Sequence, residues 1–406
     1  MPTHDVLAQL RPTLDRIAAG AADRERTRTL PFEPVVWLRD AGFGALRVPT
    51  ELGGAGLSLP ELVEVVTEVA RADSNVAHLW RGHFAVVEHA LLGDDPERRR
   101  RWASAAVGGV VVGNASSEQG NGGLWDTRTR LTQDEDGRWW LDGIKYYSTG
   151  TIFADWVNVG AVLPDGTRAG VLVPVTAPGV RVDDDWDGFG QRLTGSGTTH
   201  LDRVPVEARD ITPFGSVRPA FLGAYYQLYL LAVLCGIGRA VVDDAVAFVR
   251  PRTRTFGRGD APPPRHDPLV QGVVGRLRAA SFAADAATAV AAARLGELLD
   301  RGAVATDDDE AAADVAVYQA QVVVCDAVLR ATTELFEVGG ASSTAVGRGL
   351  DRHWRNARTI ACHNPVVEKE RLLGDHLLNG TPPSATFATR VPDRLPEPAS
   401  VPALVR

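Results

Sequence analysis

The chain has 406 residues, of which 45% are hydrophobic and 23% are charged, and its formal net charge is -8. This composition excludes a largely disordered chain, and the acidic balance argues against nucleic acid as a partner. Three cysteines without C-x-x-C spacing predict neither a disulfide framework nor a metal site, so a reducing cytoplasmic location is expected.

Residues 1–108 are predicted to form an N-terminal helical domain. Apolar and charged positions recur there at helical spacing, interrupted by prolines and by a glycine-rich cluster at 53–56. One helix is expected to start at Ser58, a serine cap that is followed by proline in the first turn. The N-terminus has no basic stretch followed by an apolar core, so no secretory signal is expected.

Residues 109–212 are predicted to form a compact β domain. The helical period gives way to short apolar or alternating runs, such as GVVVGN and AGVLVPV. Asp136-Gly137 is a tight-turn signal between two such runs and predicts a hairpin.

Residues 213–406 are predicted to form a C-terminal helical bundle with an irregular tail. Helical periodicity holds to about residue 380, and the last 20 or so residues are proline-rich. The stretch 219–238 carries no charge over about twenty residues, a length that could cross a membrane. Tyrosines and a glutamine in its middle favour a helix buried in the bundle, so no membrane association is expected.

Three segments carry a family resemblance: DAGFGALRVPTELGGAGLSLP at 40–60, LDGIKYYSTG at 141–150 and WDGFGQRLTGSG at 186–197. They resemble motifs of the acyl-CoA dehydrogenase superfamily. The last two are similar to the flavin-dependent monooxygenase branch, of the dibenzothiophene monooxygenase type. The resemblance implies an α+β protein with the acyl-CoA dehydrogenase fold: an N-terminal helical domain, a middle β-barrel-like domain and a C-terminal four-helix bundle.

The same resemblance implies a two-component enzyme and a homotetramer. Reduced flavin, FMN with FAD as the alternative, would come from a separate NAD(P)H-flavin reductase. With O2 it would give a C4a-hydroperoxyflavin that oxygenates a small aromatic or heteroatom-containing substrate at S, N or C. The chain has no G-x-G-x-x-G motif after a strand and no G-K-[ST] loop, in agreement with a separate reductase.

The β domain supplies three expected flavin contacts. The resemblance implies that Ser148 hydrogen-bonds near the flavin N5, that Trp186 packs on the ring system, and that Asn114 lines the pocket. From the residues alone, Ser148 could end a strand, Trp186 could be a core indole, and Asn114 could satisfy a turn.

A catalytic carboxylate is missing where a dehydrogenase of this family would carry it. Asn364 stands at one of the two possible positions, and the other, within 211–242, contains no Asp or Glu. Dehydrogenation of an acyl-CoA is therefore not expected. The alternative is an FAD-dependent dehydrogenase or oxidase with a non-standard base, and tightly bound yellow FAD would favour it.

Two histidines take the place of that carboxylate in the prediction. The resemblance implies that His363, in CHNPV, and His83, in RGHFAVVEH, lie in the flavin pocket. A histidine pKa near 6.5 would let His363 exchange protons near neutrality. Either histidine alone could instead have a core or surface role.

Cofactor contacts are also expected from the C-terminal part. The resemblance implies that Arg250 and Arg254 bind the flavin phosphate, and that Gly339 and Gly340 approach the flavin of a neighbouring subunit. From the residues alone, the two arginines could belong to a solvated cluster, and the two glycines could end a helix. An apolar substrate wall is expected from four aromatic residues: Trp80, Phe84, Tyr225 and Tyr229.

Overall fold

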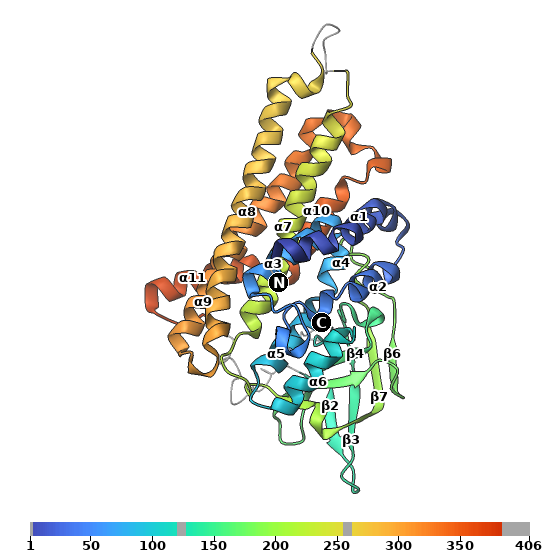
Figure 1. Cartoon of the computed structure of the whole chain (residues 1–406), viewed down its shortest axis with the longest axis vertical. Coiled ribbons are helices and arrows are strands. Elements are labelled where there is room, and N and C mark those ends of the chain that lie inside the picture. The colour runs from blue at the N-terminus through green and yellow to red at the C-terminus, as the bar shows by residue number, and fades with distance from the viewer. Residues whose placement is uncertain (1–2, 120–126, 255–261, 384–406) are drawn as a thin grey trace, which may run out of the picture.

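In the computed structural model, which describes residues 3–119, 127–254 and 262–383, the chain forms two helical parts and one part made of strands (Figure 1). They follow the predicted order of helices, strands and helices. The proline-rich tail expected at the C-terminus lies outside the described residues.

The N-terminal part consists of helices joined by short turns. The helix expected at Ser58 is confirmed: the Ser58 backbone N–H donates to Oε2 of Glu61 at 2.7 Å, in a capping box that satisfies backbone groups otherwise left open at a helix start. The helices are α1 (Thr3–Thr27), α2 (Phe32–Asp40), α3 (Leu59–Ala72), α4 (Ser74–His78), α5 (Arg81–Leu92) and α6 (Pro96–Val107).

The strands form one eight-stranded sheet, in the order β6-β7-β3-β2-β4-β5-β8 with β1 paired to β4. The hairpin predicted at Asp136-Gly137 is confirmed, because it joins two antiparallel strands, β2 and β3. The strands are β1 (Val112–Ala115), β2 (Arg130–Gln133), β3 (Trp139–Lys145), β4 (Trp156–Val162), β5 (Arg168–Pro174), β6 (Val180–Val182), β7 (Thr199–Val206) and β8 (Ile211–Pro213).

The sheet has a hydrophobic core of its own. Every second side chain of β4 is buried, because successive residues of a strand point to opposite faces: Val157, Val159 and Ala161 are at most 2% exposed. They pack with residues of β2, β3, β5 and β7 in one cluster.

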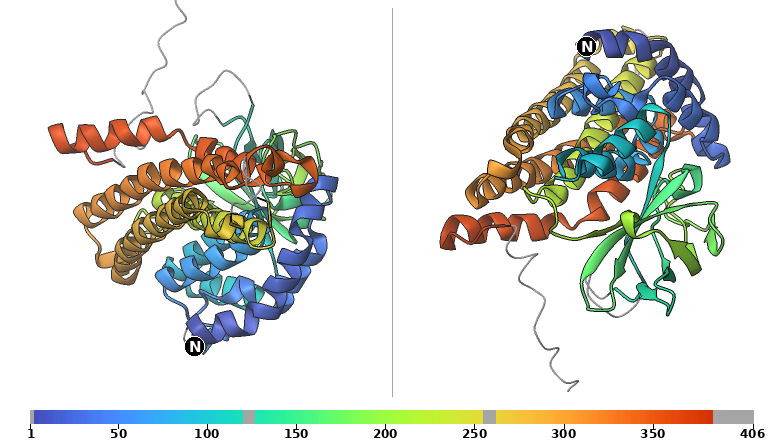
Figure 2. Two further views of the ribbon diagram at one scale, coloured as in Figure 1. Left: turned by 90° about the horizontal axis from the view of Figure 1, so that it is seen from above. Right: turned by 60° about the horizontal axis from the view of Figure 1, so that its bottom comes forward.

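The C-terminal part is built on three long helices that pack on one another, with two shorter helices beside them (Figure 2). The stretch 219–238, expected to be a buried helix, lies largely in the buried first half of the 28-residue helix α7. The helices are α7 (Leu222–Val249), α8 (Pro268–Arg301), α9 (Asp307–Glu334), α10 (Asp351–His363) and α11 (Val366–Asn379).

The two helical parts share a single core. Leu62 and Val66 of α3 belong to the same buried cluster as Leu228 of α7. One stretch, Asp307–Val338, is long and apolar enough to cross a membrane by length and composition. In its apolar 18-residue window, 56% is buried inside the protein, as is typical of a core helix of a helical bundle.

Gly150, which ends the YYSTG segment, holds the strand part against the N-terminal helices. Its φ is +80°, and a Cβ atom there would lie 2.3 Å from the backbone oxygen of Leu79. Only glycine accommodates both the left-handed backbone and this close approach. The segment that follows β3 is thereby fixed beside the junction of α4 and α5.

Candidate active site

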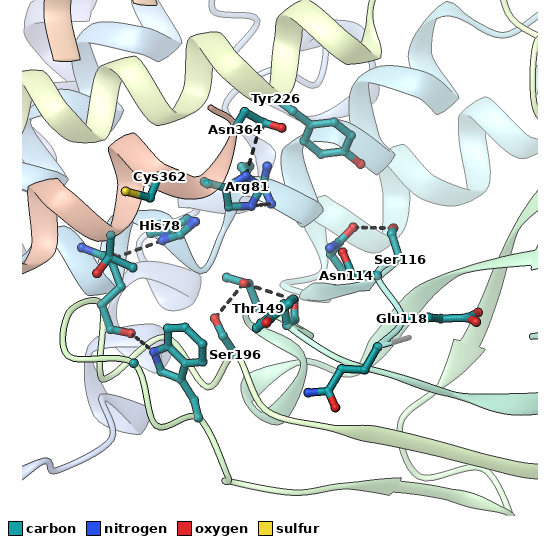
Figure 3. Close-up of a pocket in the computed structure, with 18 of the residues that line it drawn as sticks. His78, Arg81, Asn114, Ser116, Glu118, Thr149, Ser196, Tyr226, Cys362 and Asn364 are labelled. Carbon is teal, nitrogen blue, oxygen red and sulfur yellow. Dashed lines mark hydrogen bonds between the residues drawn. The ribbon is translucent and has the colours of Figure 1, made fainter. Parts of the chain in front are cut away.

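A cavity of about 810 Å³ lies where the three parts of the chain meet (Figure 3). This volume is within the usual range for ligand and cofactor sites. His78 and Arg81 enter it from the N-terminal helices, Thr149 and Ser196 from the strand part, and Asn364 from the end of α10 (Figure 3). The site therefore needs all three parts to be assembled.

Two of the expected flavin contacts, Asn114 and Trp186, border this cavity. The Trp186 indole N–H donates to the backbone oxygen of Gln191 at 3.0 Å, and its ring meets the Tyr147 ring edge-on at a centroid distance of 5.8 Å. Asn114 lies on β1, and its Oδ1 accepts a hydrogen bond from Ser116 Oγ at 3.2 Å. These contacts fix both side chains at the cavity surface.

Ser148, expected to contact the flavin, does not line the cavity. Its side chain is fully buried, whereas its neighbours Tyr147 and Thr149 line the cavity. Tyr147 has a left-handed backbone with φ +57°, which changes the direction of the chain at this point. In place of the Ser148 hydroxyl, the cavity lining includes that of Thr149, whose Oγ1 lies 2.7 Å from Oγ of Ser196.

His363 borders the cavity as expected, beside a buried arginine. Nη2 of Arg81 lies 3.0 Å from Nε2 of His363, and because a guanidinium only donates, Nε2 must accept. The other ring nitrogen, Nδ1, lies 3.1 Å from Nδ2 of Asn364, which also donates to Oε1 of Gln227. A neutral ring that accepts at Nε2 carries its proton on Nδ1, so this contact brings two donors together and is not a hydrogen bond.

The proton exchange expected of His363 near neutrality is corrected by these surroundings. Burial, the Arg81 guanidinium and His78 together hold the pKa of His363 well below 6.5. These surroundings favour the neutral form of the ring, which can accept or donate a hydrogen bond.

A second cavity histidine, His78, was missed in the sequence. Its Nδ1 lies 3.0 Å from Oε1 of Gln191, whose amide nitrogen donates to Ser74 Oγ at 3.1 Å. The proton of His78 is thus on Nδ1, and Nε2 has no partner among the residues that the structure describes. Burial lowers the pKa of His78 to about 3, so this free lone pair persists at neutral pH.

His83 does not lie on the cavity. Its ring is completely buried, Nε2 lies 2.9 Å from the Gly44 oxygen, and Nδ1 accepts from the Val112 N–H at 3.3 Å. Both ring nitrogens are engaged by the backbone, which leaves neither for a ligand. The histidine of this region that lines the cavity is His78.

The aromatic wall expected for the substrate is also corrected. The residues expected to form it are at most 3% exposed and belong to the core shared by the helical parts: Trp80, Phe84, Tyr225 and Tyr229. Their apolar bodies pack inward, as large aromatic side chains of a core do. The aromatic residues that do line the cavity are Tyr147, Trp186, Phe189 and Tyr226.

The expected phosphate and glycine contacts lie far from the cavity of their own chain. Gly223 at the start of α7 lines the cavity, whereas Arg250 and Arg254 follow the other end of this helix. A helix of 28 residues spans roughly 40 Å. Gly339 lies at the same far end, with Arg252 Nη1 2.9 Å from the position that its Cβ would take, and Gly340 follows it.

A buried ion pair lies at the cavity wall, where Glu118 is one of the lining residues. The Lys145 side chain is fully buried, and its Nζ lies 2.6 Å from Oε1 of Glu118. Burial raises the pKa of Glu118, but hydrogen bonds from Lys145, from the backbone of Arg128 and Thr129 and from the Thr129 hydroxyl outweigh it and lower the pKa to about 2. Glu118 is therefore a fixed anion and not a base.

Comparison with known proteins identifies the family. Residues 9–109 match the model of the acyl-CoA dehydrogenase N-terminal domain, and residues 228–368 match that of the acyl-CoA dehydrogenase C-terminal domain. A dibenzothiophene monooxygenase of Mycolicibacterium goodii is 31% identical over 92% of this chain and 91% of its own. The chain belongs to the acyl-CoA dehydrogenase superfamily, in its flavin-dependent monooxygenase branch.

Solved structures agree with this assignment. FMN-bound TdsC from Paenibacillus sp. A11-2 is 30% identical, with a TM-score of 0.87 over 93% of this chain and 98% of that one. Methanesulfinate monooxygenase MsuC from Pseudomonas fluorescens is 29% identical, with a TM-score of 0.85 over 92% of this chain and 97% of its own. The predicted fold and the predicted monooxygenase branch are confirmed.

Proposed function

We propose that this monooxygenase binds reduced FMN in the three-part cavity and uses O2 to oxygenate a small substrate at a sulfur or nitrogen atom. Reduced FMN, when bound, supplies two electrons to O2, so that one oxygen atom goes to the substrate and the other to water. The names of the relatives, which include a dibenzothiophene monooxygenase and an FMN-bound structure, support this choice of cofactor and of sulfur.

The observation that carries the proposal is the lack of a usable base at the cavity. Among the described residues that line it, Glu118 is the one carboxylate, and Lys145 and two backbone N–H groups hold it ionised. Asn364 stands where a dehydrogenase of this family would carry its base, and its amide donates to Gln227 at 3.0 Å. Among the described lining residues, proton abstraction from a substrate carbon, which the alternative dehydrogenase needs, therefore has no free carboxylate to carry it out.

The residues present fit a flavin. The Trp186 ring offers an aromatic surface at the cavity edge, and the unpartnered Nε2 of His78 offers a buried hydrogen-bond acceptor. Arg128 and Arg358 line the same cavity and can balance the charge of a phosphate. His363 and Asn114 remain our candidates for orienting the reacting groups, and the structure adds Thr149.

Turnover should require reduced FMN from outside the protein. With a photochemically or enzymatically reduced FMN supply, the purified chain should consume O2 and form an oxygenated product from thioethers or sulfinates. With NADH or NADPH alone, in a preparation free of reductase, product should be absent, because we propose that a separate reductase supplies the electrons. Product formed from NAD(P)H alone would refute the two-component scheme.

We also propose a homotetramer in which the arginine end of one bundle reaches the cavity of a neighbour. Arg250, Arg254, Gly339 and Gly340 would then act on the neighbour's flavin. Large apolar side chains exposed on the outer faces of α8 and α9 support an association surface: Leu269 is 81% exposed, Phe282 65%, Val290 63% and Val323 47%.

Light scattering should therefore give the mass of four chains of 43.4 kDa at micromolar concentration. Replacing Phe282 with glutamate should shift the mass toward smaller species, because a charge would be buried in the contact. A monomer mass for the unmodified chain would contradict the proposal.

We further infer a cytoplasmic location, which the free cysteines Cys235, Cys325 and Cys362 support.

A further inference from the structure

Arg81 is a buried cation that faces the cavity. It is the first residue of α5, it is 7% exposed, and it borders the cavity between the N-terminal helices and the end of α10 (Figure 3). Nη2 donates to His363, and the guanidinium carbon lies 5.0 Å from the centroid of the Tyr226 ring. In the part of the chain that the structure describes, no carboxylate pairs with it.

Two other largely buried arginines of this protein have carboxylate partners. Arg47 pairs with Glu88 at 2.7 Å and Arg24 with Asp73 at 2.9 Å, and each of these arginine side chains is 12% exposed. Burying a charge without a partner is costly, and the cost falls when an anion enters hydrogen-bond distance. Burial correspondingly lowers the pKa of Arg81.

The rest of the cavity does not supply that anion. Glu118 is already neutralised by Lys145, while Arg128 and Arg358 add positive charge to the lining. Because His363 occupies one edge of the Arg81 guanidinium and Tyr226 one face, N–H groups remain that can form paired hydrogen bonds to an oxyanion.

We propose that the substrate is a small organic anion, whose sulfinate or carboxylate group is bound by the Arg81 guanidinium inside the cavity. This proposal rests on the proposed function and specifies its substrate class. A neutral thioether or heteroaromatic ring would leave Arg81 without a counter-charge, whereas an oxyanion supplies the charge and the acceptor oxygens together.

Equilibrium binding tests the proposal without turnover. Calorimetry with the full chain saturated with oxidised FMN would compare benzenesulfinate and benzoate with two neutral analogues, methyl phenyl sulfone and benzamide. The anions should bind more tightly than the neutral pair. Arg81→Gln should weaken anion binding by about 10- to 100-fold, the range for hydrogen bonds to charged groups, and leave the neutral pair unchanged.

Two variants serve as comparisons. Arg81→Lys keeps the charge but loses the paired geometry, so it should retain part of the anion affinity. Arg294→Gln removes a surface arginine of α8 that is 61% exposed, and it should bind both anions like the unmodified protein. If Arg81→Gln fails to fold, two measurements still test the proposal. They are the anion affinity of Arg81→Lys and the ratio of anion affinity to neutral-analogue affinity in the unmodified protein.

Three results would overturn the proposal. They are equal binding of anions and neutral analogues, unchanged anion binding in Arg81→Gln, or a loss of FMN affinity in that variant as large as its loss of anion affinity. Oxygenation of neutral thioethers with no binding of anions would refute this proposal and leave the monooxygenase function intact. Anion binding without any oxygenation from reduced FMN would refute the function and leave the anion site.

Discussion

Replacing His363 with alanine should lower product formation by about 10²- to 10⁴-fold, the usual range for a well-placed proton-transfer or hydrogen-bonding group, while FMN binding changes little. The ring borders the cavity, accepts from Arg81 through Nε2 and has its proton on Nδ1. Without it, oxygen and substrate lose a group that orients them. The missing reducing equivalents should appear as hydrogen peroxide, which a peroxidase-coupled assay measures beside the product.

The pH profile separates the roles that His363 could have. Because burial and the neighbouring Arg81 and His78 lower the pKa of His363 well below 6.5, the neutral ring is the favoured form near neutral pH. Product formation should therefore show no His363 inflection between about pH 6 and 7. His363→Asn should keep part of the activity, because an amide can also accept from Arg81. Unchanged coupling of product to flavin oxidation in the alanine variant would show that His363 is only structural.

Replacing Lys145 with methionine should destabilise the protein by about 3–5 kcal/mol, because it leaves Glu118 as a largely buried anion without its partner. Glu118 also receives the backbone N–H groups of Arg128 and Thr129, so it holds the segment after β1 against β2. The same variant should bind FMN more weakly, because Ser116 lies on that segment and Asn114 directly precedes it, and both line the cavity. Denaturant unfolding followed by tryptophan fluorescence measures the first effect.

A double-mutant cycle provides the control. Glu118→Gln removes the charge that Lys145 balances, and the combination Glu118→Gln with Lys145→Met should be more stable than Lys145→Met alone, since no unpaired ion remains. Strictly additive effects would show that the pair contributes no interaction energy. Because the pKa of Glu118 is lowered to about 2, its contribution should be complete above about pH 4.5 and lost as the pH falls toward 2.

Much of the fold could be predicted because its signals are local. The start of α3 follows from a serine cap and a proline, and the β2–β3 hairpin follows from Asp136-Gly137. Asn114, Trp186 and His363 were located through family motifs and do border one cavity. These positions depend on short stretches of chain whose structure the sequence specifies directly.

The differences at the site depend on backbone conformation and packing that short stretches do not reveal. The resemblance implies Ser148, but the positive φ of Tyr147, which is uncommon for a residue with a bulky side chain, leaves Ser148 in the interior and Thr149 on the cavity. The resemblance implies His83, but α4 ends before α5 begins, and it is His78 of α4 that lines the cavity. The burial of Arg81 results from packing between parts distant in the chain.

Gln191 gives the cavity a fixed shape before any ligand arrives. Its side chain bonds Ser74 and His78 of the N-terminal part, and its backbone N–H donates to Asn356 of α10 at 2.6 Å. The three parts therefore cannot rotate independently without breaking buried hydrogen bonds. A ligand that enters loses little free energy to ordering the protein, and more of its contact energy is retained as affinity. Discrimination between ligands then depends on the complementarity of rigid walls and not on closure of one part upon another.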